Sequence, residues 1–277
     1  MTTTIMVSDE DDVTENGQRE PAGAATERTE YVQSLERGIS VIKAFGEDTP
    51  RLTLAEVAKS TGLARGAARR FLLTLQKLGY IDTDGRYFFL KPSTLEIGYS
   101  YLSSLPWWKS AQRVTDELSR DLGISVAVGV LERDTVVYVA YGLPDKFAIS
   151  GRTVGTRLPA YASAIGRVLL AYANASEQNE YFSSAHLQKL TPATQTDVAK
   201  FKAALEDVAQ NGFALVDQEL QLGLKTLAVP IRNRAGVVVA AMGIDLSSLP
   251  GSVETLMQSA LPKLTRASAR VTEGFAN

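Results

Sequence analysis

The chain has 277 residues, a formal net charge of −2 and 45% hydrophobic residues, which is typical of a globular protein with one large or two modest domains. It has no cysteine, which excludes disulfides, thiolate zinc sites and cysteine nucleophiles. Its single histidine, His186, leaves little room for other metal sites or serine–histidine catalysis.

Known targeting and cofactor signals do not occur in the sequence. No apolar run approaches the roughly 18 residues of a membrane span, and the acidic N-terminus is not a secretory signal. There is also no EF-hand loop, P-loop or GxGxxG motif. We therefore expect a cytoplasmic protein without a membrane partner, and we assign no cofactor, metal ligand or catalytic residue.

The charge is unevenly distributed along the chain. Residues 1–30 carry eight acids and two bases, whereas residues 31–92 carry ten bases and six acids. The polar composition of the first segment predicts a disordered acidic tail over 1–30. A basic segment after an acidic one indicates a surface for nucleic acid.

Residues 31–91 contain three predicted helices and a hairpin. Leu35, Ile39, Ile42 and Phe45 recur at helical spacing and predict a first helix with one apolar face. The second helix is short: it begins with the capping box Thr53-x-x-Glu56 and ends at Gly62. A third helix follows at once, with its apolar positions at helical spacing: Leu63, Ala68, Phe71, Leu72, Leu75 and Leu78.

The third helix is basic, and it precedes two short predicted strands around an Asp84-Gly85 turn. A capping box, an Asp-Gly hairpin and a basic helix are each common features. Together and in this order they predict a winged helix-turn-helix, in which the third helix enters the major groove of DNA. We therefore expect residues 31–91 to bind DNA.

A further helix is expected over residues 92–106, starting at Pro92 and stopping at Pro106. Its apolar face, with Leu95, Tyr99 and Leu102, packs either against a second copy of the chain or against its own domain. Residues 107–277 mix helices and strands without strict alternation. This pattern favours an α+β domain with a largely antiparallel sheet.

At this point the chain resembles the IclR family of bacterial transcriptional regulators, from about Tyr31 to the C-terminus. The resemblance rests on "SLERGISVIKAF", "TLAEVAKSTGLARGAARRFLLTLQKLGYI", "VGTRLPAYASAIGRVLLA" and "GLKTLAVPIRNRAGVVVAAMGI". More narrowly, "ARGAARRFLLTLQKLGY" and "VDQELQLGLKTLAVP" are similar to the branch that controls protocatechuate and 4-hydroxybenzoate catabolism.

The resemblance implies a GAF-like C-terminal domain that binds a small organic acid, aromatic or keto-dicarboxylic. It also implies a homodimer or dimer of dimers on double-stranded operator DNA. The acidic tail lies outside the family pattern.

In the DNA-binding domain, Arg65 stands at the start of the third helix, where side chains meet base edges first. Gly66 and Ala67 are small and allow close approach. Of Arg69 and Arg70, one is expected to reach a base and the other a phosphate, and the sequence does not say which. Thr53, Arg86 and Tyr87 are expected phosphate partners from the second helix and the wing.

In the effector domain, the resemblance places the pocket around "GTRLPAYAS", "VDQELQLGLKT" and "AAMGID". Arg157, with Arg152 as a second candidate, is expected to bind a carboxylate near a helix start at about Tyr161. Arg157 could instead pair with Asp217 or Glu219, and Tyr161 could belong to the core. The remaining expected contacts are polar groups and apolar walls: Tyr161, Ser163, Thr226, Asp217, Glu219, Leu224, Ala228 and Met242.

Two other function classes compete with a regulator. A hydrolase with a DNA-binding appendage would use His186 with Ser183 or Ser184, but residues this close on one helix do not face each other usefully. A sensor that acts only through protein partners conflicts with the intact basic winged helix.

Overall fold

The computed structural model describes residues 31–144, 151–247 and 252–275. The predicted acidic tail, 1–30, lies outside the described residues. The chain divides into two compact units, with the boundary between Gly98 and Tyr99. This boundary falls inside the segment 92–106 that the sequence predicts as a linker helix.

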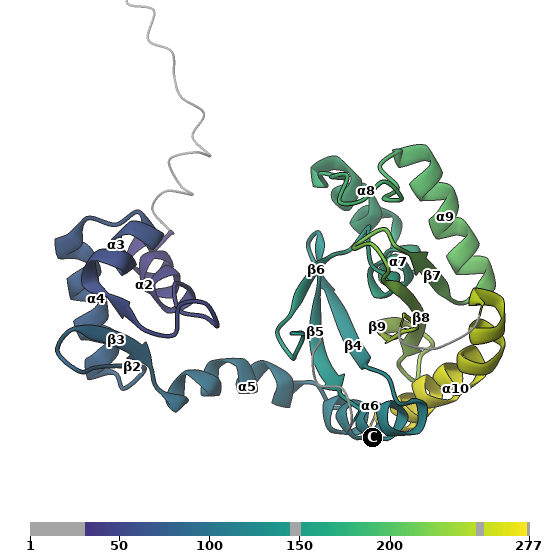
Figure 1. The fold of residues 1–277 in the computed structure, drawn as a ribbon, viewed down its shortest axis with the longest axis horizontal. Helices are drawn as coiled ribbons and strands as arrows, with labels where there is room; N and C mark the ends of the chain where they lie inside the picture. Colours follow the sequence, from purple (N-terminus) through teal and green to yellow (C-terminus); the bar gives the residue numbers. More distant parts are fainter. Residues whose placement is uncertain (1–30, 145–150, 248–251, 276–277) are drawn as a thin grey trace, which may run out of the picture. The chain divides into compact units, whose positions relative to one another are not determined.

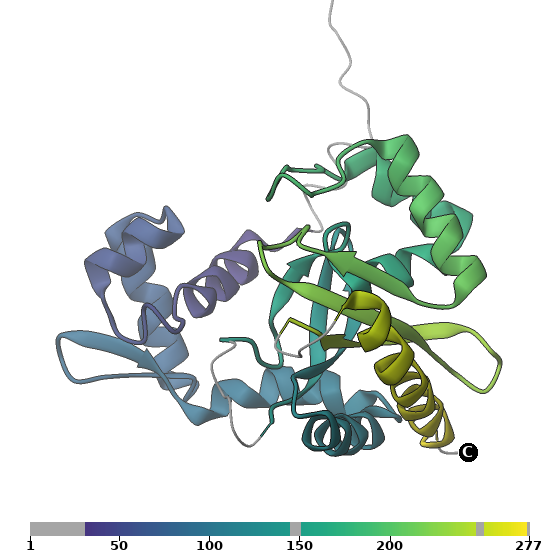
Figure 2. The same ribbon diagram turned by 45° about the vertical axis from the view of Figure 1, so that its right-hand side comes forward.

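The first unit has the expected order of helices and strands (Figure 1). Helices α2 (Gln33–Lys43), α3 (Leu54–Thr61) and α4 (Arg65–Lys77) precede the hairpin of β2 (Ile81–Thr83) and β3 (Tyr87–Leu90). A two-residue strand that was not predicted, β1 (Leu52–Thr53), pairs antiparallel with β3. Within the described residues the sheet order is β1-β3-β2, and the hairpin extends from the three helices as a wing (Figure 2).

The local signals for α3 act as predicted. Thr53 caps the helix by accepting from the Glu56 N–H, the Glu56 carboxylate accepts from the Thr53 N–H, and Gly62 ends the helix in the left-handed region at φ 67°. The expected apolar face of α2 is only partly correct. Of the four predicted residues, Phe45, just after α2, is buried and Ile42 packs against the core, whereas Leu35 and Ile39 are exposed. Val41, which the pattern did not include, is buried, because the small core of this unit reaches only the C-terminal half of α2.

The linker segment forms a 3-10 turn, η1 (Pro92–Thr94), and helix α5 (Leu95–Ser104). Leu95 and Tyr99, predicted on its apolar face, are exposed. Leu102 and Leu105 pack against the core of the second unit.

The second unit is built on an antiparallel sheet of six strands within its described residues, in the order β6-β5-β4-β9-β8-β7. The strands are β4 (Val126–Glu132), β5 (Thr135–Gly142), β6 (Arg157–Pro159), β7 (Ala214–Asp217), β8 (Lys225–Arg232) and β9 (Val238–Asp245). Strand β6 lies at one edge of this sheet.

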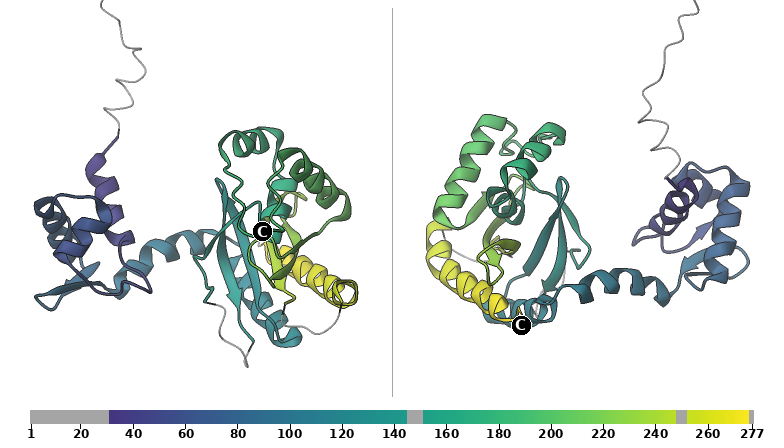
Figure 3. Two further views of the ribbon diagram at one scale, coloured as in Figure 1. Left: turned by 45° about the horizontal axis from the view of Figure 1, so that its top comes forward. Right: turned by 180° about the vertical axis from the view of Figure 1, so that it is seen from behind.

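Helices cover both faces of this sheet (Figures 1 and 3). On one face, α6 (Trp108–Leu122) and α10 (Val253–Glu273) pack on a core that includes Val128, Met242 and Leu264. On the other face, α7 (Ala164–Ala171) and α9 (Val198–Asn211) pack on a core that includes Ile165, Phe201 and Ala241. Helix α8 (Ala175–Ser184) follows α7.

The helices also show the place of one proline and whether any helix could span a membrane. Pro262 lies inside helix α10, which continues past it to Glu273. Among the described residues, no helix combines the length and apolar character needed to cross a bilayer.

Candidate DNA interface and effector pocket

The first unit has a surface hollow where α3, α4 and the wing meet. The first turn of α3 contributes Leu54 and Ala55, next to the capping residue Thr53. From α4 come Arg65, Arg69 and Leu73, which are spaced four residues apart and so share one face of the helix. Arg86 of the wing is the third basic side chain around this hollow, and the positive charge of the three arginines suits a phosphate.

The wing turn is held by Asp84. Its carboxylate accepts hydrogen bonds from the backbone N–H groups of Tyr87 at 2.8 Å and Arg86 at 3.0 Å. These bonds, more than the nearby guanidinium of Arg51, lower the pKa of Asp84. The carboxylate therefore stays ionised and fixes the turn that carries Arg86.

Arg51 was not predicted as part of this surface. Its guanidinium donates to Asp84 at 2.6 Å and lies over the rings of Phe89 and Tyr87, 4.9 and 5.9 Å from their centroids. Arg51 thus braces the wing against the strand that precedes α3. A single arginine before a short strand gives no sequence signal for this contact.

The other predicted DNA-binding residues lie outside the hollow. Gly66 and Arg70 are exposed on α4 and Ala67 is half-buried, while the Tyr87 ring packs against Arg86, whose guanidinium is 5.1 Å from its centroid. The structure therefore separates Arg69, inside the hollow, from Arg70, outside it.

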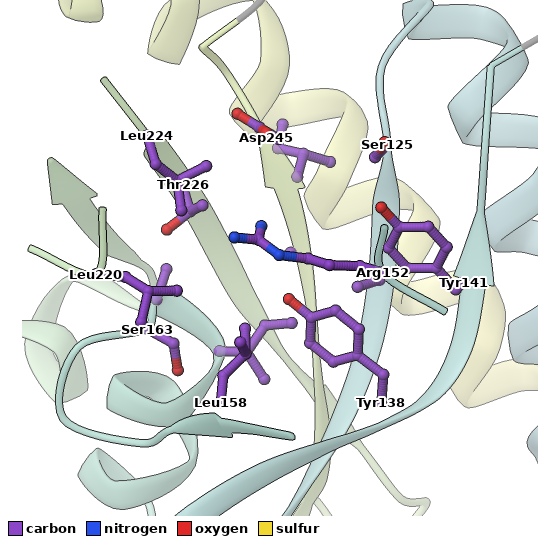
Figure 4. Close-up of a pocket in the computed structure, with 15 residues that line it drawn as sticks. Ser125, Tyr138, Tyr141, Arg152, Leu158, Ser163, Leu220, Leu224, Thr226 and Asp245 are labelled. Atoms are coloured by element: carbon purple, nitrogen blue, oxygen red, sulfur yellow. The ribbon is translucent and has the colours of Figure 1, made fainter. Parts of the chain in front are cut away.

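The second unit has a pocket on the α7 face of the sheet, with about 490 Å³ of space, including the part open to solvent. Of the residues predicted for an effector, Arg152, Ser163, Leu224 and Thr226 line it (Figure 4). Residues that sequence reasoning missed also line it: Ser125, Tyr138, Tyr141, Leu158, Leu220 and Asp245.

Two tyrosines form an aromatic wall of the pocket. Tyr138 and Tyr141 stack with ring centroids 5.8 Å apart and ring planes inclined by 16°. Residues three apart on a regular strand point to opposite faces. Here the register shifts opposite Val128 and Gly129, so an extra residue, Val139, brings both rings to the same face.

Polar groups meet around the Arg152 side chain. In Figure 4 it runs across the pocket, with the Tyr138 hydroxyl on one side and Asp245 and Thr226 on the other. Burial raises the pKa of Tyr138 to about 12, although Arg152 acts in the opposite direction. Tyr138 is therefore a protonated phenol at neutral pH and can donate a hydrogen bond.

The helix start that faces the pocket lies two residues later than expected. Ser163, not Tyr161, precedes α7, and its hydroxyl accepts from the Gly166 N–H at 3.1 Å. The first turn of α7, with Ala164 and Ile165, lines the pocket and brings the positive end of the helix dipole to it.

Arg157 and Tyr161 lie outside the pocket, which corrects two expectations. Arg157 sits on edge strand β6 and pairs with the Glu132 carboxylate and the Thr135 hydroxyl, because β6 turns its side chain to solvent. The Tyr161 ring is in the core, and its hydroxyl donates to the Gln188 carbonyl at 2.9 Å.

The other residues predicted to contact the effector lie outside the pocket and have other partners. Met242 points to the α6 and α10 face because side chains alternate along β9, and Ala228 is buried in the core beneath α7. Asp217 lies 3.8 Å from the Lys225 ammonium, and Glu219 forms a buried pair with Arg167.

The residues considered for hydrolysis have other partners. The Ser183 and Ser184 hydroxyls both donate to the Glu180 carbonyl, at 2.8 and 3.0 Å, and His186 lies beyond the end of α8. Among the described residues, no group of three acidic, histidine or cysteine side chains could hold a metal ion.

Comparison with known proteins assigns both units. Residues 34–85 match the IclR helix-turn-helix domain, and residues 99–272, more than half of the chain, match the IclR C-terminal domain of bacterial transcriptional regulators. The chain belongs to the IclR family. As an IclR-type protein it is a DNA-binding transcriptional regulator with an effector-binding C-terminal domain, and not an enzyme.

Two curated relatives are regulators by name, and the name of the second refers to p-hydroxybenzoate hydroxylase. The Pca regulon regulatory protein of Pseudomonas putida is 39% identical over 88% of this chain and 84% of its own. The p-hydroxybenzoate hydroxylase transcriptional activator of Acinetobacter baylyi is 38% identical over 86% of this chain and 90% of its own.

Solved IclR structures share the fold. A transcriptional regulator from Rhodococcus sp. RHA1 is 41% identical, with a TM-score of 0.79 over 88% of this chain and 98% of its own. The inducer-binding domain of PobR from Acinetobacter, a double mutant in complex with 3-hydroxybenzoic acid, is 30% identical, with a TM-score of 0.55 over 59% of this chain and 96% of its own.

Proposed function

We propose that this regulator senses an aromatic hydroxy acid such as 4-hydroxybenzoate or protocatechuate in the pocket of its second unit. The observation that carries this proposal is one pocket in which Arg152 and the first turn of α7 accompany the stacked rings of Tyr138 and Tyr141. The names of the two curated relatives, and the hydroxybenzoate bound to the PobR domain, support the same ligand class.

The pocket chemistry suits a monocarboxylate with a ring hydroxyl. The Arg152 guanidinium and the α7 N-terminus would bind the carboxylate, since both favour negative charge. The aromatic wall would stack on the ring, and Asp245, Thr226 or Ser125 would bond its hydroxyl. A keto-dicarboxylate such as β-ketoadipate would bring a second negative charge toward Asp245, which disfavours it.

Calorimetric titration of the full-length protein with 4-hydroxybenzoate, protocatechuate and β-ketoadipate tests this assignment. We expect Arg152→Met to raise the dissociation constant of the best aromatic acid at least tenfold, which corresponds to about 1.4 kcal/mol. Arg157→Gln is the matched control, because this arginine is exposed and paired outside the pocket. Unchanged binding in Arg152→Met, or lost binding in Arg157→Gln, contradicts the assignment.

For the DNA-binding unit, we propose that α4 enters the major groove of operator DNA with Arg65, at its start, close to base edges. Thr53, Arg69 and Arg86, around the hollow, would receive a backbone phosphate. We further propose that the regulator binds as a homodimer or a dimer of dimers. The exposed apolar side chains of Leu35 and Ile39 on α2 and of Leu95 on α5 support this, since a second copy would cover them.

Because operator DNA is cytoplasmic in a bacterium, we propose that the protein acts in the cytoplasm.

A further inference from the structure

One wall of the effector pocket is a short segment between β7 and β8, Gln218–Leu224. It supplies Leu220 and Leu224 to the pocket. The segment closes on itself, because the Gln218 N–H donates to the Leu224 carbonyl at 2.7 Å and the Gly223 N–H donates to the Gln218 side chain at 3.1 Å. Gln218 has a φ of 60°, a left-handed conformation that is uncommon for a residue other than glycine.

A buried ion pair fastens this segment to α7. The Arg167 guanidinium lies 2.6 Å from the Glu219 carboxylate, and the two side chains are only 8% and 12% exposed. Arg167 also donates to the Tyr161 carbonyl at 3.0 Å, and its guanidinium is 5.4 Å from the centroid of the Phe201 ring. The arginine thus has a fixed position, and it determines where Glu219 lies.

The same segment is held from the side of the α8–α9 connection. The Glu219 carboxylate accepts from the Gln195 N–H at 2.8 Å, and its backbone carbonyl accepts from the Thr194 hydroxyl at 2.7 Å. The Thr191 hydroxyl donates to the Gln218 carbonyl at 2.7 Å. All three hydrogen bonds from the α8–α9 connection are to Gln218 or Glu219. These two residues come immediately before Leu220, the first residue of the segment that lines the pocket.

An ion pair of this kind is a poor way to gain stability. Desolvation of two charges offsets much of their attraction, and replacing a buried pair by apolar residues is often neutral or stabilising. Burial indeed acts to lower the pKa of Arg167, while Glu219 acts to raise it. The location of this pair, at the root of a pocket wall, points to positioning as its role.

We propose that Arg167 and Glu219 are positioning residues of the effector site. Without contacting the acid, they hold Gln218–Leu224 as a wall, so that effector affinity and residence time depend on the pair. This inference rests on the proposed aromatic-acid site. Once the pair is lost, Leu220 and Leu224 no longer pack against the ring in one fixed arrangement, and the acid escapes faster.

The test measures binding of 4-hydroxybenzoate and protocatechuate to full-length variants, by calorimetry for the dissociation constant and by stopped flow for the dissociation rate. We expect Glu219→Gln, which keeps the side-chain shape, to raise the dissociation constant at least tenfold, mainly through faster dissociation. Arg167→Lys keeps the charge and should recover part of the affinity that Arg167→Met loses. Glu132→Gln, which breaks the exposed Arg157 pair, should bind as wild type.

A lower melting temperature with unchanged affinity in Glu219→Gln would mean a structural role only and would overturn the proposal. Where a single variant does not fold, the double variant Arg167→Met/Glu219→Leu replaces the pair by apolar side chains of similar size. We expect the double variant to fold and still bind the acid at least tenfold more weakly, and wild-type affinity in it would overturn the proposal.

A wrong assignment of the effector can be told apart from a wrong role for the Arg167–Glu219 pair. If the wild-type protein binds none of the acids, the proposed function is wrong, and hydrogen exchange tests the positioning role directly. Glu219→Gln should then speed exchange of the Gln218, Gly223 and Leu224 amides and leave the β8 amides protected. Unchanged exchange of these three amides would overturn the role of the pair.

Discussion

Arg69 and Arg70 are neighbours in sequence with different surroundings. Arg69 shares the hollow with Thr53, Arg86 and the first turn of α3, a set of groups that suits a phosphate. Arg70 is exposed outside the hollow. We therefore propose that Arg69 binds a phosphate and that Arg70 reaches a base edge, a division that the sequence left open.

This assignment predicts two different binding defects. Arg69→Ala should weaken binding to specific and scrambled duplexes about equally and reduce the salt dependence by the equivalent of about one phosphate contact. Arg70→Ala should cost about 1–3 kcal/mol on the specific duplex alone, since a bidentate base contact is lost. Fluorescence anisotropy at several salt concentrations, with a duplex that the wild-type protein selects from a random pool, measures both. The reverse pattern would exchange the two roles.

At the scale of elements, α7 approaches the preceding chain very closely. A Cβ on Gly166 would lie 2.2 Å from the Ala160 carbonyl oxygen and 2.4 Å from its Cα, so it would meet backbone that cannot move aside. A Cβ on Gly243, beneath the same helix, would come closest to Ile165 side-chain atoms, the nearest at 2.8 Å, and would lie 3.4 Å from the Leu227 carbonyl oxygen, an ordinary contact distance. The two glycines therefore differ in how well the surroundings can adjust.

Gly166→Ala is expected to destabilise the second unit by about 1–3 kcal/mol or more, because overpacking against backbone forces a shift of α7. Gly243→Ala should cost less stability but should weaken effector binding, since Gly243 and Ile165 both line the pocket. Urea unfolding and calorimetry of the two variants separate the effects. If the Gly166→Ala protein were as stable as wild type, α7 would not pack closely against the Ala160 backbone.

The elements that the sequence predicted are those with local signals. The capping box of α3 and the Asp84-Gly85 turn act over a few residues, so the helix and hairpin follow directly. Strand β1 exists only through its pairing with β3, and the common face of Tyr138 and Tyr141 depends on the register shift beside Val139. Such features depend on partners distant in sequence, which periodicity does not reveal.

The same dependence on partners distant in sequence explains why only some of the predicted pocket residues line the pocket. The segments "GTRLPAYAS" and "VDQELQLGLKT" do border the pocket, but most of the side chains chosen within them point elsewhere. The place of Arg157 before a helix favours it over Arg152 in the sequence, yet β6 turns its side chain to solvent. The sequence predicts Met242 as an apolar wall of the pocket, but strand alternation places it on the opposite face of the sheet.

At the scale of the whole molecule, the chain divides into two compact units, with the boundary inside α5. Exposed apolar residues on α2 make the first unit a candidate for self-association. Ile39→Glu should therefore weaken dimerisation at least tenfold, because it would place a charge in the contact. Sedimentation equilibrium measures this, with Leu190→Glu, an exposed apolar residue of the second unit, as control. An unchanged association constant for Ile39→Glu would place the interface elsewhere.

The construction of the pocket has a consequence for evolution and for biosensor design. Its α7 side is fixed by close backbone packing at Gly166, whereas Leu220 and Leu224 lie on a segment anchored through Gln218 and Glu219. Substitutions at the two leucines can therefore reshape the pocket without disturbing the anchors. A library confined to these two positions offers a direct way to retune the regulator to differently substituted aromatic acids.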